Sequence, residues 1–175
     1  KRDGKRILIK DLSANGDADE GERVWAGFKQ AYSACLKDQS IKTVVIDTET
    51  ELWELIRLAR FGKLTQVMPY HYGPVNAEFR KVIREAYDSD KNLILLHKMK
   101  PKYVNDKRTN EYERSGFNDV GFLVQVNCMV YRDPVDEGGE FNLEVLDCRQ
   151  NPEAAGVVLE GPMASWDFLA STVLE

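Results

Sequence analysis

The chain has 175 residues, of which 43% are apolar and 30% are charged, with a formal net charge of −5. This balance predicts a globular domain with a core of its own and excludes an intrinsically disordered chain. The sequence contains no run of 18 apolar residues and no secretory signal pattern, so we expect neither a transmembrane helix nor a membrane partner.

The first half of the chain predicts two strands and one long helix. A short apolar run at residues 6–10 predicts a strand, and the polar segment 11–21 predicts a loop. Apolar residues then recur at helical spacing from 24 to 36, which predicts an amphipathic helix of about four turns. The β-branched run at 43–47 is typical of a strand that is buried on both faces of a parallel sheet.

A second helix is predicted from Leu52 to Ala59, ending near Gly62. Thr48 is expected to cap its first turn, with the side chain of Glu51 reaching back as the second half of a capping box. Pro69 to Pro74 is predicted to be a turn.

The second half of the chain alternates between apolar runs and polar connections. Residues 75–86 predict a third helix, 92–97 another buried strand, and 98–119 a long polar loop that is functional or mobile. Residues 123–131 and 141–148 predict a hairpin around Asp136-Glu137-Gly138-Gly139. The tail has a weak helical pattern at Trp166, Leu169 and Val173.

These elements predict an α/β domain with a mostly parallel sheet and an antiparallel edge. Ligands of such sheets bind at the carboxyl ends of the strands. Asp47 and His97 each follow an apolar strand, so we expect both to face the same crevice.

Asp47 at the end of Val44-Val45-Ile46 matches the Walker B pattern, in which a carboxylate holds Mg²⁺ beside nucleotide phosphates. The other interpretation is an aspartate that caps or turns the chain. Glu49 is a candidate to polarise an attacking water, and Glu51 is a weaker one because the capping box explains it. His97 either donates a hydrogen bond to a γ-phosphate or is a half-exposed histidine satisfied by backbone.

The stretch after His97 is basic and contains an aromatic residue. Such a segment can hold phosphates through its cations and stack a base on its tyrosine, or it can reach the nucleotide of a neighbouring subunit. The alternative is a solvated loop. The candidate contact residues are Lys98, Lys100, Lys102, Tyr103, Lys107 and Arg108.

Charge is distributed unevenly along the sequence. Residues 134–175 contain nine acids and one arginine, a net charge of −8, so residues 1–133 carry +3. Two poles of opposite sign suit head-to-tail assembly or anion binding, although an uneven solvated surface is equally common. The three cysteines, Cys35, Cys128 and Cys148, form no C-x-x-C pair, which argues against disulfides and structural zinc and favours a reducing, cytoplasmic compartment.

Three blocks of sequence resemble a family of phage-encoded RecA-like ATPases. The blocks are TVVIDTETELW at 43–53, YGPVNAEFRK at 72–81 and NLILLHKMKPKY at 92–103, and the similarity continues at 116–117 and 122–126. Members of this family are AAA-type nucleotide-binding proteins, some of which are single-strand annealing recombinases. The resemblance covers roughly residues 41–132, and the order and spacing of the blocks are more specific than any one of them.

The resemblance implies a RecA-like three-layer core. Together with the antiparallel C-terminal hairpin expected from the residues themselves, this core takes up residues 1–150, and residues 151–175 are expected to form an acidic tail or helix. The acidic end after Pro134 has no match in the family. It implies binding of ATP with Mg²⁺ at Asp47 and Thr48, catalytic roles for Glu49 and His97, homo-oligomers, and single-stranded DNA as a partner. It also implies a phage protein of the bacterial cytoplasm.

The sequence contains no G-x-x-x-x-G-K-[S/T] phosphate loop. In the family this loop precedes the strand expected at residues 6–10. Either the chain is a fragment or this relative has lost the loop, and in both cases we expect the chain alone to be inactive as an ATPase. The rival hypotheses are a RecA-like module that binds DNA or protein without hydrolysis, and an unrelated small-molecule enzyme, which no set of residues supports.

Overall fold

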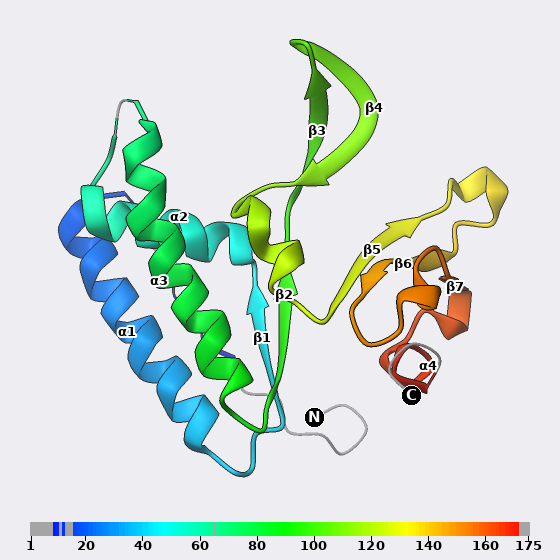
Figure 1. Cartoon of the computed structure of the whole chain (residues 1–175), viewed down its shortest axis with the longest axis horizontal. Coiled ribbons are helices and arrows are strands. Elements are labelled where there is room, and N and C mark those ends of the chain that lie inside the picture. Colours follow the sequence, from blue (N-terminus) through cyan, green and yellow to red (C-terminus); the bar gives the residue numbers. More distant parts are fainter. Residues whose placement is uncertain (1–8, 11, 13–15, 65, 172–175) are drawn as a thin grey trace. The chain divides into compact units, whose positions relative to one another are not determined.

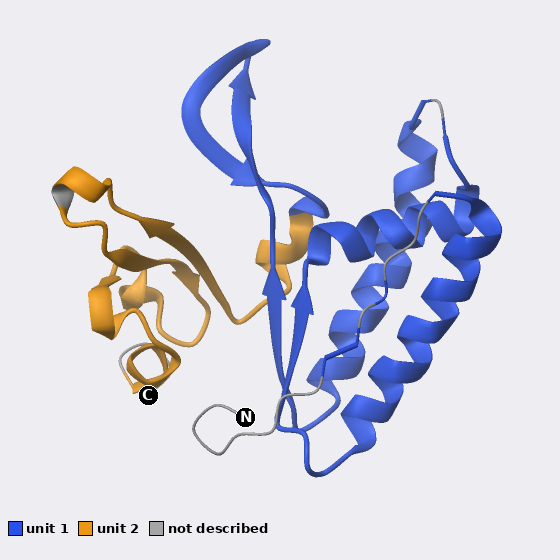
Figure 2. Ribbon diagram, turned by 180° about the vertical axis from the view of Figure 1, so that it is seen from behind, with its two compact units in different colours: residues 1–118 blue, residues 119–175 orange. Residues whose placement is uncertain are grey.

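The computed structural model describes residues 9–10, 12, 16–64 and 66–171. The chain divides into two compact units, residues 1–118 and residues 119–175 (Figure 2). The boundary of the units therefore lies between Asn118 and Asp119, whereas the sequence-based division was placed at residue 150.

Three helices lie to one side of a two-stranded parallel sheet in the first unit (Figure 1). They are α1 (Ala18–Lys37), α2 (Glu49–Phe61) and α3 (Pro69–Tyr87), and the strands are β1 (Thr43–Asp47) and β2 (Asn92–Leu96). The helix predicted at 24–36 is confirmed, although it begins at Ala18, within the segment that was predicted to be a loop. Strands form at 43–47 and 92–96 as predicted, but the expectation that they are buried on both faces is wrong, because Val45 is 54% exposed and Ile46 is the one buried residue of β1. The helix predicted at 52–59 is also confirmed, and Gly62 is its C-cap with a φ of 66°.

Aromatic side chains of α1 form the main packing surface of the helices. Trp25 stacks on Phe28 with ring centroids 5.3 Å apart, and Phe28 stacks on Tyr32 at 5.5 Å. The Tyr32 hydroxyl donates a buried hydrogen bond of 2.8 Å to the carbonyl of Val82 in α3. Burial, followed by the nearby charge of Glu85, raises the pKa of Tyr32, so this hydroxyl stays a donor at physiological pH.

The turn predicted at 69–74 is wrong, because α3 already begins at Pro69. Proline is accepted at the first position of a helix, where its missing N–H has no partner to lose. The His71 side chain supports this start, because its Nδ1 accepts a hydrogen bond of 2.9 Å from the N–H of Met68.

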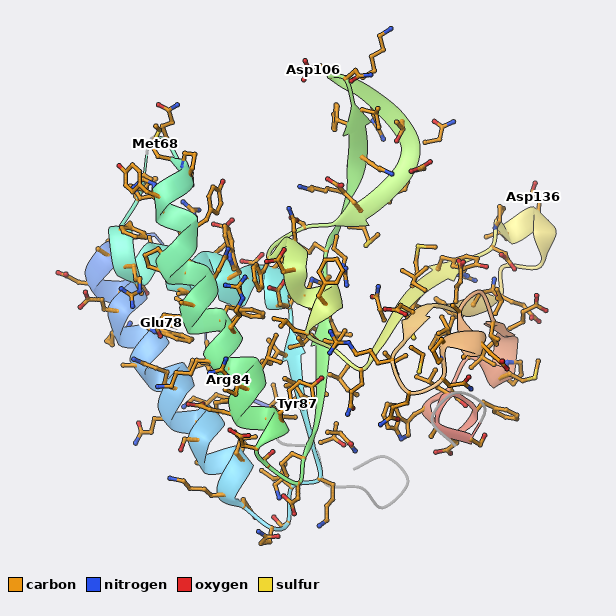
Figure 3. The ribbon with its side chains drawn as sticks, in the orientation of Figure 1. Met68, Glu78, Arg84, Tyr87, Asp106 and Asp136 are labelled. Atoms are coloured by element: carbon orange, nitrogen blue, oxygen red, sulfur yellow. The ribbon has the colours of Figure 1, made fainter. Side chains whose placement is uncertain are left out.

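The long loop predicted at 98–119 is also wrong. Residues Met99–Val104 (β3) and Lys107–Arg114 (β4) form an antiparallel hairpin, followed by a 3₁₀ turn at Asn118–Phe122. Asn105 and Asp106 both have positive φ, which is the backbone of a tight two-residue turn. The hairpin extends from the end of β2, with Asp106 at its tip (Figure 3).

The second unit contains a three-stranded antiparallel sheet, built from β5 (Val126–Arg132), β6 (Phe141–Cys148) and β7 (Val158–Glu160). The predicted hairpin around residues 136–139 is confirmed by the β5–β6 pairing. The core of the unit contains Val145, Cys148 and Leu159. A short helix, α4 (Trp166–Leu169), lies in the predicted tail, whereas Val173 is outside the described residues.

The RecA-like core with a mostly parallel sheet is contradicted by this topology. Within the described residues only β1 and β2 pair in parallel, and the other five strands form two antiparallel sheets. Residues 99–104 and 107–114 pair with each other in a hairpin and do not join the β1–β2 sheet. The strand expected at 6–10 falls largely outside the described residues, and Ile9 and Lys10 are not in a strand.

Candidate functional site

The carboxyl ends of β1 and β2 lie side by side. The strands pair in parallel register, so that Asp47 is the partner of Leu96 and His97 follows directly. Asp47 and His97 therefore lie at the same carboxyl edge of this parallel pair, as expected from the strand order, whereas the shared crevice stays a prediction. Asp47 is exposed there, and it makes no ion pair with any described residue.

The first turn of α2 begins immediately after Asp47. The Asp47–Thr48 peptide bond is cis, and the Thr48 hydroxyl accepts a hydrogen bond of 3.2 Å from the N–H of Glu51, as predicted for an N-cap. The Glu51 side chain does not close the expected capping box. It forms an ion pair with the ammonium of Lys98 instead.

Glu49 is the most unusual residue of this edge, because its carboxylate is 0% exposed. His97 Nδ1 lies 2.9 Å from Glu49 Oε2, and the imidazole is itself only 10% exposed. Neither carboxylate oxygen of Glu49 has a hydrogen-bond partner among the described residues. A buried carboxylate is costly unless a polar partner compensates for its lost hydration, and the His97 imidazole is the side chain that lies against it here.

Gly116 lies directly against the Glu49 carboxylate. A Cβ at this position would lie 2.5 Å from Glu49 Oε2, and the backbone φ is +105°. Only glycine combines this backbone conformation with such a close approach. The glycine therefore lets the chain pass directly over the buried carboxylate.

The same turn of α2 also holds both ends of the hairpin. The Thr50 hydroxyl donates to the carbonyl of Ser115 at 3.0 Å and accepts from the N–H of Lys98 at 3.2 Å. The N–H of Ser115 donates to the carbonyl of Lys98 at 2.8 Å. Lys98 precedes β3 and Ser115 follows β4, so the base of the hairpin is fixed to residues 49–51.

Phe117 anchors the chain after the hairpin. Its ring is buried against α3, in an edge-to-face contact with Phe79 at 5.7 Å. The guanidinium of Arg80 lies over the Phe117 ring, 4.9 Å from its centroid. The hairpin therefore extends from a rigid base, with β2 on one side and this aromatic anchor on the other.

One face of the hairpin is occupied by ion pairs. Lys100 pairs with Glu113 at 3.3 Å, and Lys102 pairs with Glu111 at 2.7 Å. The contact holds the pKa of Glu111 below its usual value and raises the pKa of Lys102, mainly through their shared hydrogen bond. These lysines already have anionic partners, so they contribute less positive potential than the sequence suggested.

The opposite face contains no acid. Cross-strand neighbours share a face of a hairpin, so the pairs 99 with 114, 101 with 112 and 103 with 108 lie together. Tyr103 is 62% exposed and Tyr112 is 58% exposed. We call this surface the aromatic face, and it consists of Met99, Pro101, Tyr103, Arg108, Tyr112 and Arg114.

The predicted site residues are thus arranged in two groups. Thr48, Glu49 and His97 gather beside Asp47 at the sheet edge, whereas Lys107 and Arg108 lie with Tyr103 toward the hairpin tip. No group of three or more potential metal ligands occurs among the residues that the structure describes. Mg²⁺ bound to a nucleotide needs only one or two protein carboxylates beside the phosphates, so a single exposed Asp47 fits that role.

Sequence reasoning missed Thr50, Ser115, Gly116 and the second tyrosine, Tyr112. The alternation of residues 99–104 and 107–114 around Asn-Asp was the signal for the hairpin and for the face that Tyr112 shares with Tyr103. Nothing in the sequence marks Thr50 or Ser115, because their roles depend on contacts between segments that are 65 residues apart.

Comparisons with known proteins add no relative. A scan against protein-family models finds no match, and a search of curated proteins finds no similar sequence. None of the helices among the described residues is long and apolar enough to cross a membrane.

Proposed function

We propose that this chain is the nucleotide-responsive, DNA-binding part of an ATP-dependent phage recombination or replication protein. One observation carries the proposal: residues 49–51 contact both ends of the hairpin, and they directly follow Asp47 and Thr48 at the sheet edge. A ligand that binds at Asp47 would act on the segment that holds the hairpin. Single-stranded DNA is the proposed partner of the aromatic face.

The residues of the edge have distinct roles in this proposal. Asp47 would hold the Mg²⁺ ion of a Mg·ATP complex. The bound ATP would bring negatively charged phosphates next to the residues of the sheet edge. His97 would contact the terminal phosphate. Glu49 is fully buried, so it acts by holding the His97 imidazole rather than by polarising water itself.

Tyrosines and arginines suit single-stranded DNA. A base can stack on an exposed tyrosine ring, and each such stack contributes about 1–3 kcal/mol. Arg108 and Lys107 would neutralise phosphates, which makes the affinity dependent on salt. Bases stack without sequence preference on such surfaces, so the hairpin is expected to bind many sequences.

The test measures the affinity of the chain for a fluorescent oligo-dT by anisotropy, with and without Mg·ATP. We expect Mg·ATP to change the affinity at least threefold in the wild type and to have no effect on Asp47→Asn. ATP hydrolysis is not the readout, because the chain contains no phosphate loop. An affinity that ignores Mg·ATP would overturn the nucleotide part of the proposal.

The second candidate function is DNA binding without nucleotide. The observation that favours it is the acid-free aromatic face, which needs no contribution from Asp47. Tyr103→Ala should then weaken oligo-dT binding at least fivefold. Tyr87→Ala is the matched control, because this exposed tyrosine ends α3 at the opposite end of the unit from Asp106 (Figure 3). Equal effects of the two substitutions would exclude the hairpin as the DNA site.

A further inference from the structure

The aromatic face of the hairpin presents apolar and cationic groups together. Met99, Tyr103 and Tyr112 are exposed on it, and Arg108 of β4 is the cross-strand partner of Tyr103. Over residues 98–114 the sequence has six basic and three acidic side chains, and all three acids lie off this face. An exposed patch of this composition is typical of a protein contact surface.

The second unit presents a sheet face of opposite character. In the β5–β6–β7 register, Asn127 pairs with Asp147, Met129 with Glu144, and Glu144 with Val158. These residues lie on the side of the sheet opposite to the core residues Val145 and Leu159. We call this surface the acidic face, and it consists of Asn127, Met129, Tyr131, Glu144, Asp147, Val158 and Glu160. Asn142 lies on the same side of β6 but is only 3% exposed, so it is not part of this surface.

The two faces are complementary in charge and in apolar content. The acidic face contains three carboxylates and no lysine or arginine, beside a methionine, a tyrosine and a valine. The whole second unit, residues 119–175, has eleven acids against two arginines. Opposed potentials of this kind select partners and speed their encounter.

A second copy of the chain fits this pattern better than a foreign protein, because one chain supplies both faces. The hairpin tip lies about 20 Å from its base, at 3.3 Å per residue for six residues of β3, so its cations are presented well beyond the helices that anchor it. Because each copy has one hairpin and one acidic face, such a contact repeats from copy to copy.

We propose that the chain assembles head to tail, with the aromatic face of one copy docked on the acidic face of the next. The proposal is independent of nucleotide binding. It does place single-stranded DNA and the neighbouring copy on the same hairpin face, so oligo-dT should compete with assembly.

The test uses sedimentation of two charge-reversal variants of the full chain, Tyr103→Ser/Arg108→Glu and Glu144→Lys/Glu160→Lys. The wild type should form a ladder of species at low salt that dissociates at high salt. Each variant alone should be a monomer, with at least tenfold weaker association. An equimolar mixture should form a dimer and nothing larger, because it contains one intact hairpin and one intact acidic face.

Circular dichroism and thermal unfolding of each variant show whether it is folded, and the mixture itself shows that both intact faces remain competent. Lys81→Glu/Arg23→Glu is the matched control, since both side chains are exposed on α3 and α1, and it should assemble like the wild type. A wild type that stays monomeric at low salt would overturn the proposal. So would a mixture that forms no dimer, or an assembly that requires DNA.

Discussion

Glu49 at the sheet edge is buried, whereas the glutamates of the hairpin are exposed to solvent. Glu49 is fully buried and has the His97 imidazole as its close partner, whereas Glu111 and Glu113 are exposed and pair with lysines across the hairpin. A buried charge that loses its partner is costly, while an exposed one is simply hydrated. The same residue type can therefore fix a structure in one place and leave it almost unaffected in another.

The two regions also differ in the roles that we propose for them: the edge residues position the hairpin, and the hairpin residues bind a partner. The edge residues contact segments distant in the sequence and fix the base of the hairpin, through Thr50, Ser115 and Lys98. On the aromatic face, Met99, Tyr103 and Tyr112 are exposed to solvent. Substitutions at the edge should therefore change stability, and substitutions on the hairpin should change binding.

The largest expected effect is that of His97→Ala. Removing the imidazole leaves the Glu49 carboxylate buried without its partner, so we expect a loss of roughly 3 kcal/mol in the free energy of unfolding. Urea denaturation measures it. Adding Glu49→Gln to His97→Ala removes the buried charge and should recover most of the loss. If the single and double variants are equally unstable, the pair does not account for the cost.

A smaller loss, about 2 kcal/mol, is expected for Gly116→Ala. The new methyl group would collide with Glu49 Oε2, and alanine disfavours a φ of +105°. The matched control is Gly73→Ala within α3, where a Cβ meets no atom within 4 Å. There alanine should stabilise the helix by roughly 0.5–1 kcal/mol. Destabilisation by both substitutions would show that the collision at Glu49 is not the cause.

Thr50→Val tests the connection between the edge and the hairpin. Valine has a similar shape but cannot bond Ser115 or Lys98, so we expect a loss of about 1–2 kcal/mol. Hydrogen exchange should become faster in β3 and β4 and remain unchanged in α1. Uniformly faster exchange throughout the unit would mean that Thr50 supports the fold as a whole, with no particular role at the hairpin base.

Local patterns predicted the parts of this molecule that depend on nearby residues. The apolar runs around Val45 and Ile94 identified β1 and β2, and their alignment at Asp47 followed from the rules for parallel strands. Proline and polar content misled the interpretation of Pro69 and of residues 98–119. A helix accepts proline at its start, and a hairpin whose strands are exposed can be rich in charged residues, as this one is.

The site itself was predictable only in part. Glu49 and His97 were identified as candidates from their positions after strands, but the burial of Glu49 depends on Gly116, which is distant in the sequence. The prediction of a mostly parallel sheet failed for a related reason. The number of strands in a sheet depends on pairing between distant segments, and the pattern of apolar and polar residues within one segment does not determine that pairing.

The smallest effect on stability is expected for Lys102→Ala, because the Lys102–Glu111 pair is exposed on both sides. The urea midpoint should not change measurably. The substitution should instead raise the pKa of Glu111 toward its usual value, since Lys102 is what lowers it. A carboxyl titration by NMR measures this change.

The direction of the pH effect follows from the lowered pKa of Glu111. Any stabilisation by this pair is present above the usual glutamate pKa and is lost as the pH falls through the depressed value of the folded chain. Added salt should reduce it further. A clear fall in stability of Lys102→Ala at neutral pH would mean that the hairpin charges hold structure as Glu49 does, and the distinction between edge and hairpin would fail.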